Sequence, residues 1–332
     1  MRPFTFFVVA AAVGALLFLT IRWIGNDYLF FAGYTVLQFI VLATAWNILG
    51  GYCGYVNFGS AAFFAVGAYS TVALHKLGTG IDRYAAEFIA PALHIVMPLS
   101  IPSLTVIAGI IAGAIGFGMG YLTLRLRGAY FAIATLALAV VLQTLVVNWD
   151  YVGGSRGAYI IRPQTVPIIG SYIQYLFLIM VILSIVAIAV ARIIEQSRLG
   201  YGFATIRDDE LAAEACGVPT LKLKLIATTI SGALMGMAGA PFPYYIGYLE
   251  PSSAFGLAYA VNSIAMPMIG GTTSWVGPLI GAILLGTLQQ LATVTISSAV
   301  NLLIVGVLLV TFVIIAPNGL VGLVQERLRK RR

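Results

Sequence analysis

Side chains that could carry out chemistry are scarce in this sequence, and their spacing supports no enzyme. No long apolar block has a Lys, Arg, Asp, Glu or His at its centre, and no serine has an obvious base nearby. No glycine-rich phosphate loop is followed by Lys and Ser or Thr, so we do not expect the chain to hydrolyse ATP itself. Cys53 and Cys216 lie far apart, and the chain has only two histidines. We therefore expect no catalytic residue, no disulfide, no metal site and no cofactor.

Two glycine-rich stretches are the clearest local signals. The first runs from Trp46 to Ser60 and the second from Pro267 to Pro278. Such backbone leaves amide and carbonyl groups free, which a membrane tolerates only where protein or water satisfies them. Helix breaks of this kind often line substrate paths, although both stretches would also serve as tight turns. We predict that they approach one another and line a passage. The candidate pathway residues are Gly50, Gly51, Gly54, Asn57, Gly59, Ser60, Asn262, Pro267, Gly270 and Gly271.

A third signal is a polar segment, in which ten charged residues fall between Arg192 and Lys224. So polar a strip cannot rest in hydrocarbon and must face water or a protein. Acidic residues in a first turn suit the helix dipole, and Gly readily ends a helix. We therefore predict a short helix from Asp209 to Cys216 that ends at Gly217, although a solvated loop would look similar.

The elements that must position these residues are membrane spans. The chain has 332 residues, of which 61% are hydrophobic and 9% charged, whereas soluble domains have about 25% charged residues. The N-terminal block from Pro3 to Ile21 has no small-residue cleavage pattern, so we expect a retained span rather than a signal peptide. The block at 256–269 is short and contains Pro267, which indicates a broken or re-entrant helix. The expected spans are 4–21, 28–49, 59–75, 104–124, 129–148, 173–191, 225–247, 256–269, 277–296 and 299–316.

The basic residues predict the orientation of these spans. With a cytoplasmic amino terminus, thirteen of the 18 Lys and Arg residues fall inside, as the positive-inside rule requires. The net charge of +7 is therefore topological and does not indicate nucleic acid. We predict an all-α polytopic membrane protein of about ten transmembrane helices. It would form one permease domain over 1–332, with a cytoplasmic loop at 192–224 and a basic cytoplasmic tail at 317–332.

Small residues recur at helical spacing within the spans. Gly-x-x-x-Gly pairs occur at Gly109 and Gly113, at Gly116 and Gly120, and at Gly232 and Gly236. This spacing lets two helices approach closely. Packing within one subunit is the simpler interpretation, and a face for another subunit is the alternative.

Four stretches of the sequence resemble the LivM-type permease family of the high-affinity branched-chain amino-acid importers, which are ATP-binding-cassette systems. They are Gly50 to Leu74 (GGYCGYVNFGSAAFFAVGAYSTVAL), Leu124 to Leu138 (LRLRGAYFAIATLAL), Ser197 to Ala227 (SRLGYGFATIRDDELAAEACGVPTLKLKLIA), and Gly247 to Gly281 (GYLEPSSAFGLAYAVNSIAMPMIGGTTSWVGPLIG). The third is the most specific. A weaker fifth stretch is Gly153 to Pro163 (GGSRGAYIIRP).

The resemblance implies partners and a location. A permease of this family pairs with a second related permease to form a heterodimer, with two cytoplasmic ATP-binding subunits and with an external solute-binding protein. It lies in the lipid of a bacterial cytoplasmic (inner) membrane, and both termini are expected in the cytoplasm. The substrate would be a branched-chain or similar small aliphatic amino acid.

The resemblance also implies that a helix in the 192–224 loop docks on an ATPase. Ala212, Ala213 and Gly217 fit a Glu-Ala-Ala-x-x-x-Gly register, but Leu211 stands at the Glu position and Glu210 lies one residue early. This departure leaves the exact contacts open. The implied coupling residues are Arg207, Asp208, Asp209, Glu210, Ala212, Ala213 and Gly217.

Two other classes of function fit the residues alone. A passive channel or secondary carrier for a small neutral solute, such as urea or an amide, would also lack a nucleotide site, and its transport would persist without any ATPase. A structural membrane subunit would use the charged loop only as an assembly surface.

Overall fold

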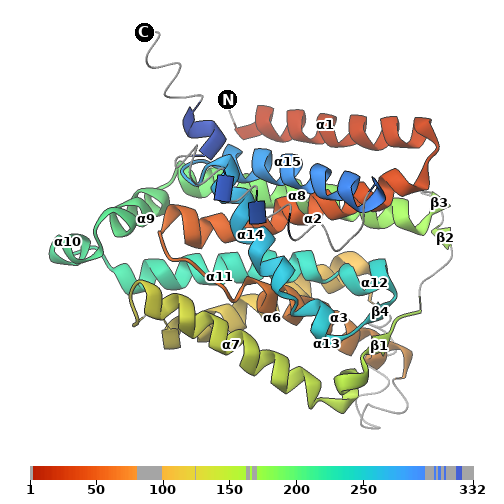
Figure 1. Ribbon diagram of the computed structural model, residues 1–332, viewed down its shortest axis with the longest axis horizontal. Helices are drawn as coiled ribbons and strands as arrows, with labels where there is room; N and C mark the ends of the chain where they lie inside the picture. Colours follow the sequence, from red (N-terminus) through yellow and green to blue (C-terminus); the bar gives the residue numbers. More distant parts are fainter. Residues whose placement is uncertain are drawn as a thin grey trace.

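The fold is a bundle of apolar helices that run roughly side by side (Figure 1). The computed structural model describes residues 3–80, 99–123, 125–161, 165–166, 170–295, 303, 306–307, 310–311 and 319–323. The long helices are α1 (Pro3–Ile24), α2 (Asp27–Asn47), α3 (Ser60–Thr79), α6 (Ile101–Thr123), α7 (Ala129–Val147), α8 (Tyr172–Glu195), α11 (Thr220–Gly239), α14 (Leu257–Gly270) and α15 (Val276–Thr295).

Shorter elements gather at the two ends of the bundle. One end carries α9 (Arg198–Asp208) and α10 (Glu210–Ala215), and we call it the α10 end. The opposite end carries two small antiparallel pairs, in which β1 (Ala158–Tyr159) pairs with β4 (Tyr248–Leu249), and β2 (Thr165–Val166) pairs with β3 (Gly170–Ser171). The remaining short helices are η1 (Ile48–Tyr52), η2 (Asp150–Val152), η3 (Gly154–Arg156), α12 (Phe242–Ile246) and α13 (Pro251–Ala254).

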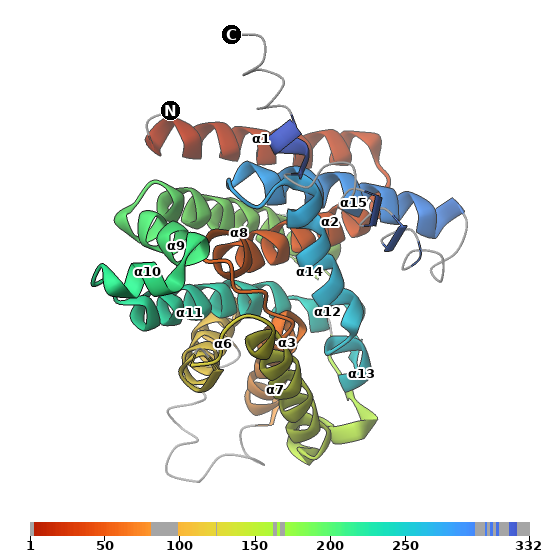
Figure 2. The ribbon, with the colours of Figure 1, turned by 60° about the vertical axis from the view of Figure 1, so that its left-hand side comes forward.

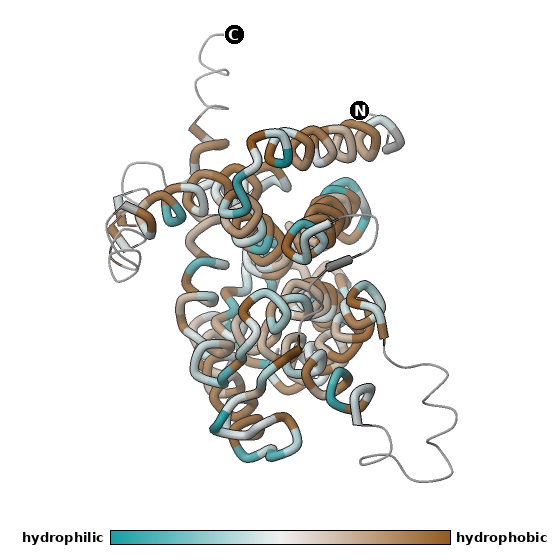
Figure 3. Tube along the Cα trace, turned by 90° about the vertical axis from the view of Figure 1, so that its right-hand side faces the viewer, coloured by the Kyte–Doolittle hydropathy of each residue, from teal (hydrophilic) through white to brown (hydrophobic). Residues whose placement is uncertain are grey.

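Within the described residues, eight helical segments are long and apolar enough to cross a membrane. They match eight of the expected spans. Viewed nearly end-on, the helices of the bundle carry many hydrophobic residues, coloured brown (Figure 3). The expected span at 59–75 is α3, a 20-residue helix that is not among the eight and carries His75 and Lys76 near its end. The expected tenth span, 299–316, lies largely outside the described residues.

The expected break at Pro267 needs a correction. The helix α14 continues through Pro267 to Gly270, and the chain leaves helical geometry only at Gly271, whose φ is +116°. The block beginning at 256 is also longer than expected, because α13 precedes α14 and extends the segment to 20 residues, from Pro251 to Gly270. The interruption in this span therefore falls at Phe255 and Gly256, between the two helices.

Small residues at the contact points let the central helices of the core approach closely. α11 packs against α6, α3 and α2, while α2 also packs against α8, α14 and α15 (Figure 2). A Cβ atom added to Gly236 of α11 would lie 2.2 Å from the Cβ of Ala112, and one added to Gly113 would lie 3.2 Å from the Cβ of Ala233. The Gly-x-x-x-Gly spacing on α6 and α11 thus serves packing within this chain.

The periphery is apolar as well. The most apolar window of α1 has no buried residue, and only 17% of that of α7 is buried. Their outward side chains, such as Leu19 and Ile133, are more than 60% exposed within the chain. Apolar side chains that face outward are expected where lipid replaces water as the solvent.

Candidate functional site

Both glycine-rich breaks and the charged segment lie at the α10 end of the bundle. The first break follows α2 and the second joins α14 to α15, whereas the charged segment joins α8 to α11. The two breaks approach closely, as predicted: a Cβ added to Gly51 would lie 2.7 Å from the carbonyl oxygen of Thr272. A Cβ added to Gly54 would lie 2.9 Å from the Cγ of Arg207, so the first break also contacts α9. Glycine is favoured at Gly51 because backbone of the second break leaves no room for a side chain, and at Gly54 because its φ is +79°.

The first break is an ordered turn. The α2 helix passes into the π-helix η1, and the chain then runs without regular structure to Ser60, where α3 begins. π-helical turns are uncommon and often occur at functional sites. The indole of Trp46 donates a hydrogen bond of 2.9 Å to the carbonyl oxygen of Asn57, whose own side chain accepts one of 2.7 Å from the amide of Gly59. Asn57 is therefore a buried residue that shapes the turn.

The second break is held by backbone packing and by a carboxylate. A Cβ added to Gly270 would lie 1.8 Å from the carbonyl oxygen of Gly277, so α14 and α15 meet backbone to backbone. Glu195, the last residue of α8, accepts a 2.7 Å hydrogen bond from the amide of Trp275 and one of 3.2 Å from the hydroxyl of Tyr52. This single carboxylate therefore joins the two breaks.

Uncharged polar pairs lie deeper in the bundle. The hydroxyls of Ser60 and Ser263 are 2.8 Å apart, and the side chain of Gln289 donates a 2.8 Å hydrogen bond to that of Asn262. All four residues are buried. Ser60 therefore contacts the residue that follows Asn262 in α14, so these two predicted pathway residues lie near one another. They supply neutral donors and acceptors and no net charge.

The helix predicted from Asp209 to Cys216 is present as α10. The side chain of Asp209 caps it by accepting hydrogen bonds from the amides of Leu211 and Ala212, at 2.9 Å and 3.1 Å. Gly217 follows with a φ of +81°, a conformation that favours glycine. Ala213 is buried against the chain itself, whereas Leu211 is 63% exposed. The outward face of α10 is therefore formed by Leu211, Ala212 and Ala215.

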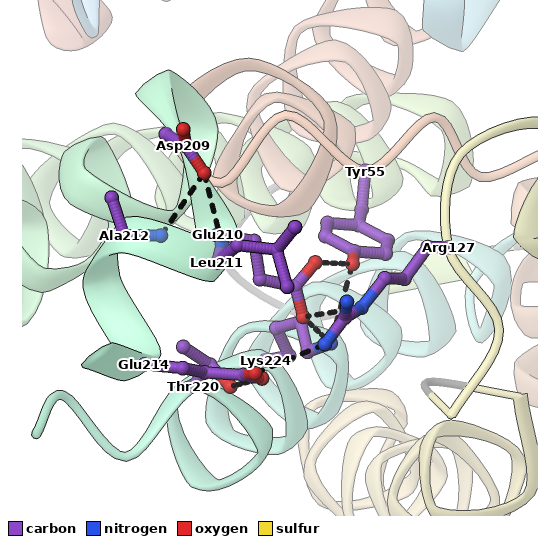
Figure 4. A network of polar contacts seen from close by, with 9 residues as sticks. All are labelled: Tyr55, Arg127, Asp209, Glu210, Leu211, Ala212, Glu214, Thr220 and Lys224. Carbon is purple, nitrogen blue, oxygen red and sulfur yellow. Dashed lines mark hydrogen bonds and ion pairs between the residues drawn. The ribbon is translucent and has the colours of Figure 1, made fainter.

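A polar network fastens α10 to the membrane helices, and Figure 4 shows its members. Glu210 lies 2.6 Å from the ammonium of Lys224 in α11 and accepts a hydrogen bond from the hydroxyl of Tyr55 in the first break. Lys224 also donates a 3.2 Å hydrogen bond to that hydroxyl. Arg127, between α6 and α7, lies 3.7 Å from Glu210. The Lys224 side chain is 3% exposed, so its charge is compensated within the chain.

A second ion pair holds the next turn of the same face of α10. Glu214 pairs with Arg127 at 3.0 Å and accepts a 2.8 Å hydrogen bond from the hydroxyl of Thr220, at the start of α11. Glu210, which lies one residue before the Glu position of the sequence register, therefore points inward. Leu211, which stands at that position, points outward.

The network sets the charge of its members. Burial acts to raise the pKa of the Glu210 carboxyl, but hydrogen bonds from Lys224 and Tyr55 and the charges of Lys224 and Arg127 outweigh it, so the pKa lies below its ordinary value. Burial, followed by the hydrogen bond to Glu210, raises the pKa of Tyr55 well above its ordinary value. At neutral pH the carboxylate is therefore ionised and the phenol is neutral.

Sequence reasoning missed four residues of this site: Tyr55, Arg127, Glu195 and Lys224. Lys224 was counted as a topological charge and as the end of the charged segment, although it lies within the first turns of an apolar helix, which is a signal for a buried partner. Tyr55 and Glu195 gave no comparable signal, because their partners are 155 and 143 residues away, respectively. Among the residues that the structure describes, no group of three His, Cys, Asp or Glu side chains could hold a metal ion.

The fold and this end of the bundle define a multi-pass membrane protein in which a small exposed helix is tied to a break between two spans. Residues 28–313 match the family model described as the permease component of the branched-chain amino acid transport system. The chain belongs to this family of permeases.

Individual relatives agree with the family. The chain is 27% identical to the high-affinity branched-chain amino acid transport system permease protein LivM of Escherichia coli K12, over 95% of this chain and 75% of that protein. It is 25% identical to the probable branched-chain amino acid transport permease protein LivH of Methanocaldococcus jannaschii, over 82% of this chain and 85% of that protein. The E. coli ribose import permease protein RbsC is 28% identical over 40% of this chain. No solved structure matches the chain.

Proposed function

We propose that this chain is the permease subunit of an ATP-driven importer and that it passes branched-chain or similar small aliphatic amino acids through the membrane. The observation that carries the proposal is the position of α10. This helix presents an exposed face outside the bundle while its inner side chains contact one of the two breaks between the spans. Such an element can receive motion from a soluble partner and deliver it to the spans.

The energy would come from partner subunits. The sequence has no phosphate-binding loop, so two cytoplasmic ATPases would hydrolyse ATP, a second related permease would complete the passage, and an external binding protein would deliver the substrate. The distribution of basic residues supports an orientation in which both termini and the α10 end lie on the cytoplasmic side.

The breaks would form the inner end of the passage. Gly50, Gly51, Gly54 and Gly59 lie in the first break, whereas Gly270 and Gly271 lie where α14 ends. Because both breaks lie at the α10 end, we assign them to a gate rather than to a binding site at mid-bilayer. The neutral pairs around Ser263 and Asn262 lie further along the helices and suit a zwitterion with an apolar side chain, since they add no charge to the path.

The docking surface for an ATPase would be the outward face of α10 together with the end of α9. Arg207, Asp208 and Leu211 offer charged and apolar exposed groups there, and the side chain of Asp208 is 75% exposed. Ala213 would support the helix from within, because it is buried against the chain. Asp209 and Gly217 would fix its two ends.

The test is reconstitution of the chain with its partner permease, ATPases and binding protein in proteoliposomes. We expect uptake of radiolabelled leucine only when ATP and loaded binding protein are both present, and no uptake with a non-hydrolysable nucleotide. Urea and ribose, supplied in place of leucine, serve as controls for substrate class. Leucine or urea flux through the permease without ATPases would contradict the proposal and would indicate a passive channel or carrier.

A further inference from the structure

The first break is held at two tyrosines that lie three residues apart. On one side, the Tyr52 hydroxyl donates a hydrogen bond of 3.2 Å to Glu195, whose carboxylate also accepts the amide of Trp275 in the second break. This contact involves α8 and the turn between α14 and α15, and neither α9 nor α10 takes part in it. It attaches the start of the break to the bundle.

On the other side, Tyr55 is attached to the exposed helix. Its hydroxyl donates to Glu210 of α10 and accepts a hydrogen bond from Lys224, while the ammonium of Lys224 also lies 4.8 Å from the centre of the Tyr55 ring. The ring packs edge-on against Phe131 at 5.0 Å and is buried. A displacement of α10 would therefore act on Tyr55 directly.

One of the two residues between these attachments is a glycine. Gly54 has a φ of +79°, a conformation that side chains rarely adopt, and it packs against Arg207 at the end of α9. With Tyr52 held by α8 and Tyr55 held by α10, relative motion of the two helices would be absorbed at Cys53 and Gly54 and would load the 3.1 Å hydrogen bond from the Tyr55 amide to the carbonyl oxygen of Leu49.

Beyond Tyr55 the break leads into the spans. The amide of Phe58 donates a 3.2 Å hydrogen bond to the hydroxyl of Thr135 in α7, and Ser60, the first residue of α3, contacts Ser263 of α14. Motion of Tyr55 would thus reach α3, α7 and α14 through a segment of five residues.

We propose that Tyr55 is a positioning residue that carries the displacement of α10 to the break, with Gly54 as the hinge and the Tyr52–Glu195 contact as the fixed anchor. The inference rests on the proposed function and adds to it the part that moves. The hydroxyl of Tyr55 is the transmitting group, because it hydrogen-bonds to both Glu210 and Lys224.

The experiment compares wild type with Tyr55→Phe in the complete reconstituted complex. Tyr55→Phe keeps the ring and its contact with Phe131 but removes the hydroxyl. Tyr130→Phe is the matched control, because Tyr130 lies at the same end of the bundle and is 74% exposed. Motion is followed with Val56→Cys in a Cys216→Ser background, because Val56 is 41% exposed. The rate at which this cysteine reacts with a thiol reagent is measured in the presence and absence of ATP.

In wild type and in Tyr130→Phe, we expect ATP to change the reaction rate at position 56. In Tyr55→Phe that change should be lost, while ATPase co-purification stays normal. The amount of leucine imported per ATP hydrolysed should fall by about fivefold or more, which corresponds to a typical coupling energy between two sites. Should Tyr55→Phe fail to assemble, Glu210→Gln removes the charge from the same contact and should give the same two changes. An unchanged ratio and an unchanged response at position 56 in an assembled variant would overturn the inference. A wild-type complex without ATP-dependent uptake would instead overturn the proposed function, and this inference with it.

Discussion

The contact between α3 and α11 allows a quantitative test of the fold through Gly67→Ala. A Cβ atom at Gly67 would lie 2.0 Å from the carbonyl oxygen of Gly236 and 2.6 Å from its carbonyl carbon. Real Cβ contacts under 3.0 Å essentially never occur. The two helices would have to separate by about 1 Å, and overpacking of this kind costs about 1–3 kcal/mol.

The same substitution has an opposing effect that a control can isolate. Replacing Gly by Ala inside a helix stabilises it by about 0.5–1 kcal/mol, because Ala loses less conformational freedom. Gly118 in α6 has no atom within 4 Å of an added Cβ, so Gly118→Ala should show this gain alone. Because this gain is common to both variants, we expect their free energies of unfolding to differ by the overpacking cost alone, about 1–3 kcal/mol, with Gly67→Ala the less stable.

The assay is unfolding of the purified chain by SDS in mixed micelles, followed by circular dichroism. Both variants are measured against wild type in the same detergent. Equal stabilities of Gly67→Ala and Gly118→Ala would show that α3 and α11 do not meet at this point, and the helix packing described above would be wrong.

Three further predictions concern the α10 end. Gly270→Ala should lower ATP-driven uptake per folded complex, because its Cβ would lie 1.8 Å from the carbonyl oxygen of Gly277. Gly286→Ala is the control and should have little effect, because the atom nearest to its Cβ lies 3.4 Å away. Equal uptake in both variants would mean that the second break is only a turn. Leu211→Arg should reduce the amount of ATPase that co-purifies, because the side chain faces outward. Leu221→Arg is the control, since this residue is also exposed but belongs to α11. Undiminished co-purification of ATPase with the Leu211 variant would exclude this face as the docking surface. The difference in free energy of unfolding between wild type and Glu210→Gln should be constant above pH 4.5, the ordinary pKa of the carboxyl. It should vanish as pH falls through the lowered pKa of the folded state. A difference that is already lost near pH 7 would contradict the network.

Much of the architecture could be predicted from the sequence, because lipid imposes strict requirements on the chain. Blocks of about twenty apolar residues are long enough to span, and charged residues are confined to their ends. The short helix α10 was also predictable, because its cap Asp209 and the closing Gly217 are local in sequence. The same applies to the first break, where the glycines themselves mark the turn.

The site could be predicted only in part, because its contacts join distant residues. Glu210 was assigned to the docking surface, but it points inward to Lys224 and Tyr55, and the pairing depends on how α10 folds back against α11. Pro267 was read as a helix break, yet α14 continues through it to Gly270. A proline costs one backbone hydrogen bond, and packing against neighbouring helices can compensate for that loss.

The central claim, that the α10 end is cytoplasmic and docks an ATPase, is tested most directly by labelling Cys216. This residue is exposed one position after α10, whereas Cys53 is buried and burial raises the pKa of its thiol to about 12. A membrane-impermeant maleimide at neutral pH should therefore label Cys216 alone, and Cys216→Ser should abolish the signal. We predict labelling in inside-out vesicles only, and protection of Cys216 when the ATPase is bound. Labelling from the external side, or labelling that the bound ATPase leaves unchanged, would contradict the account.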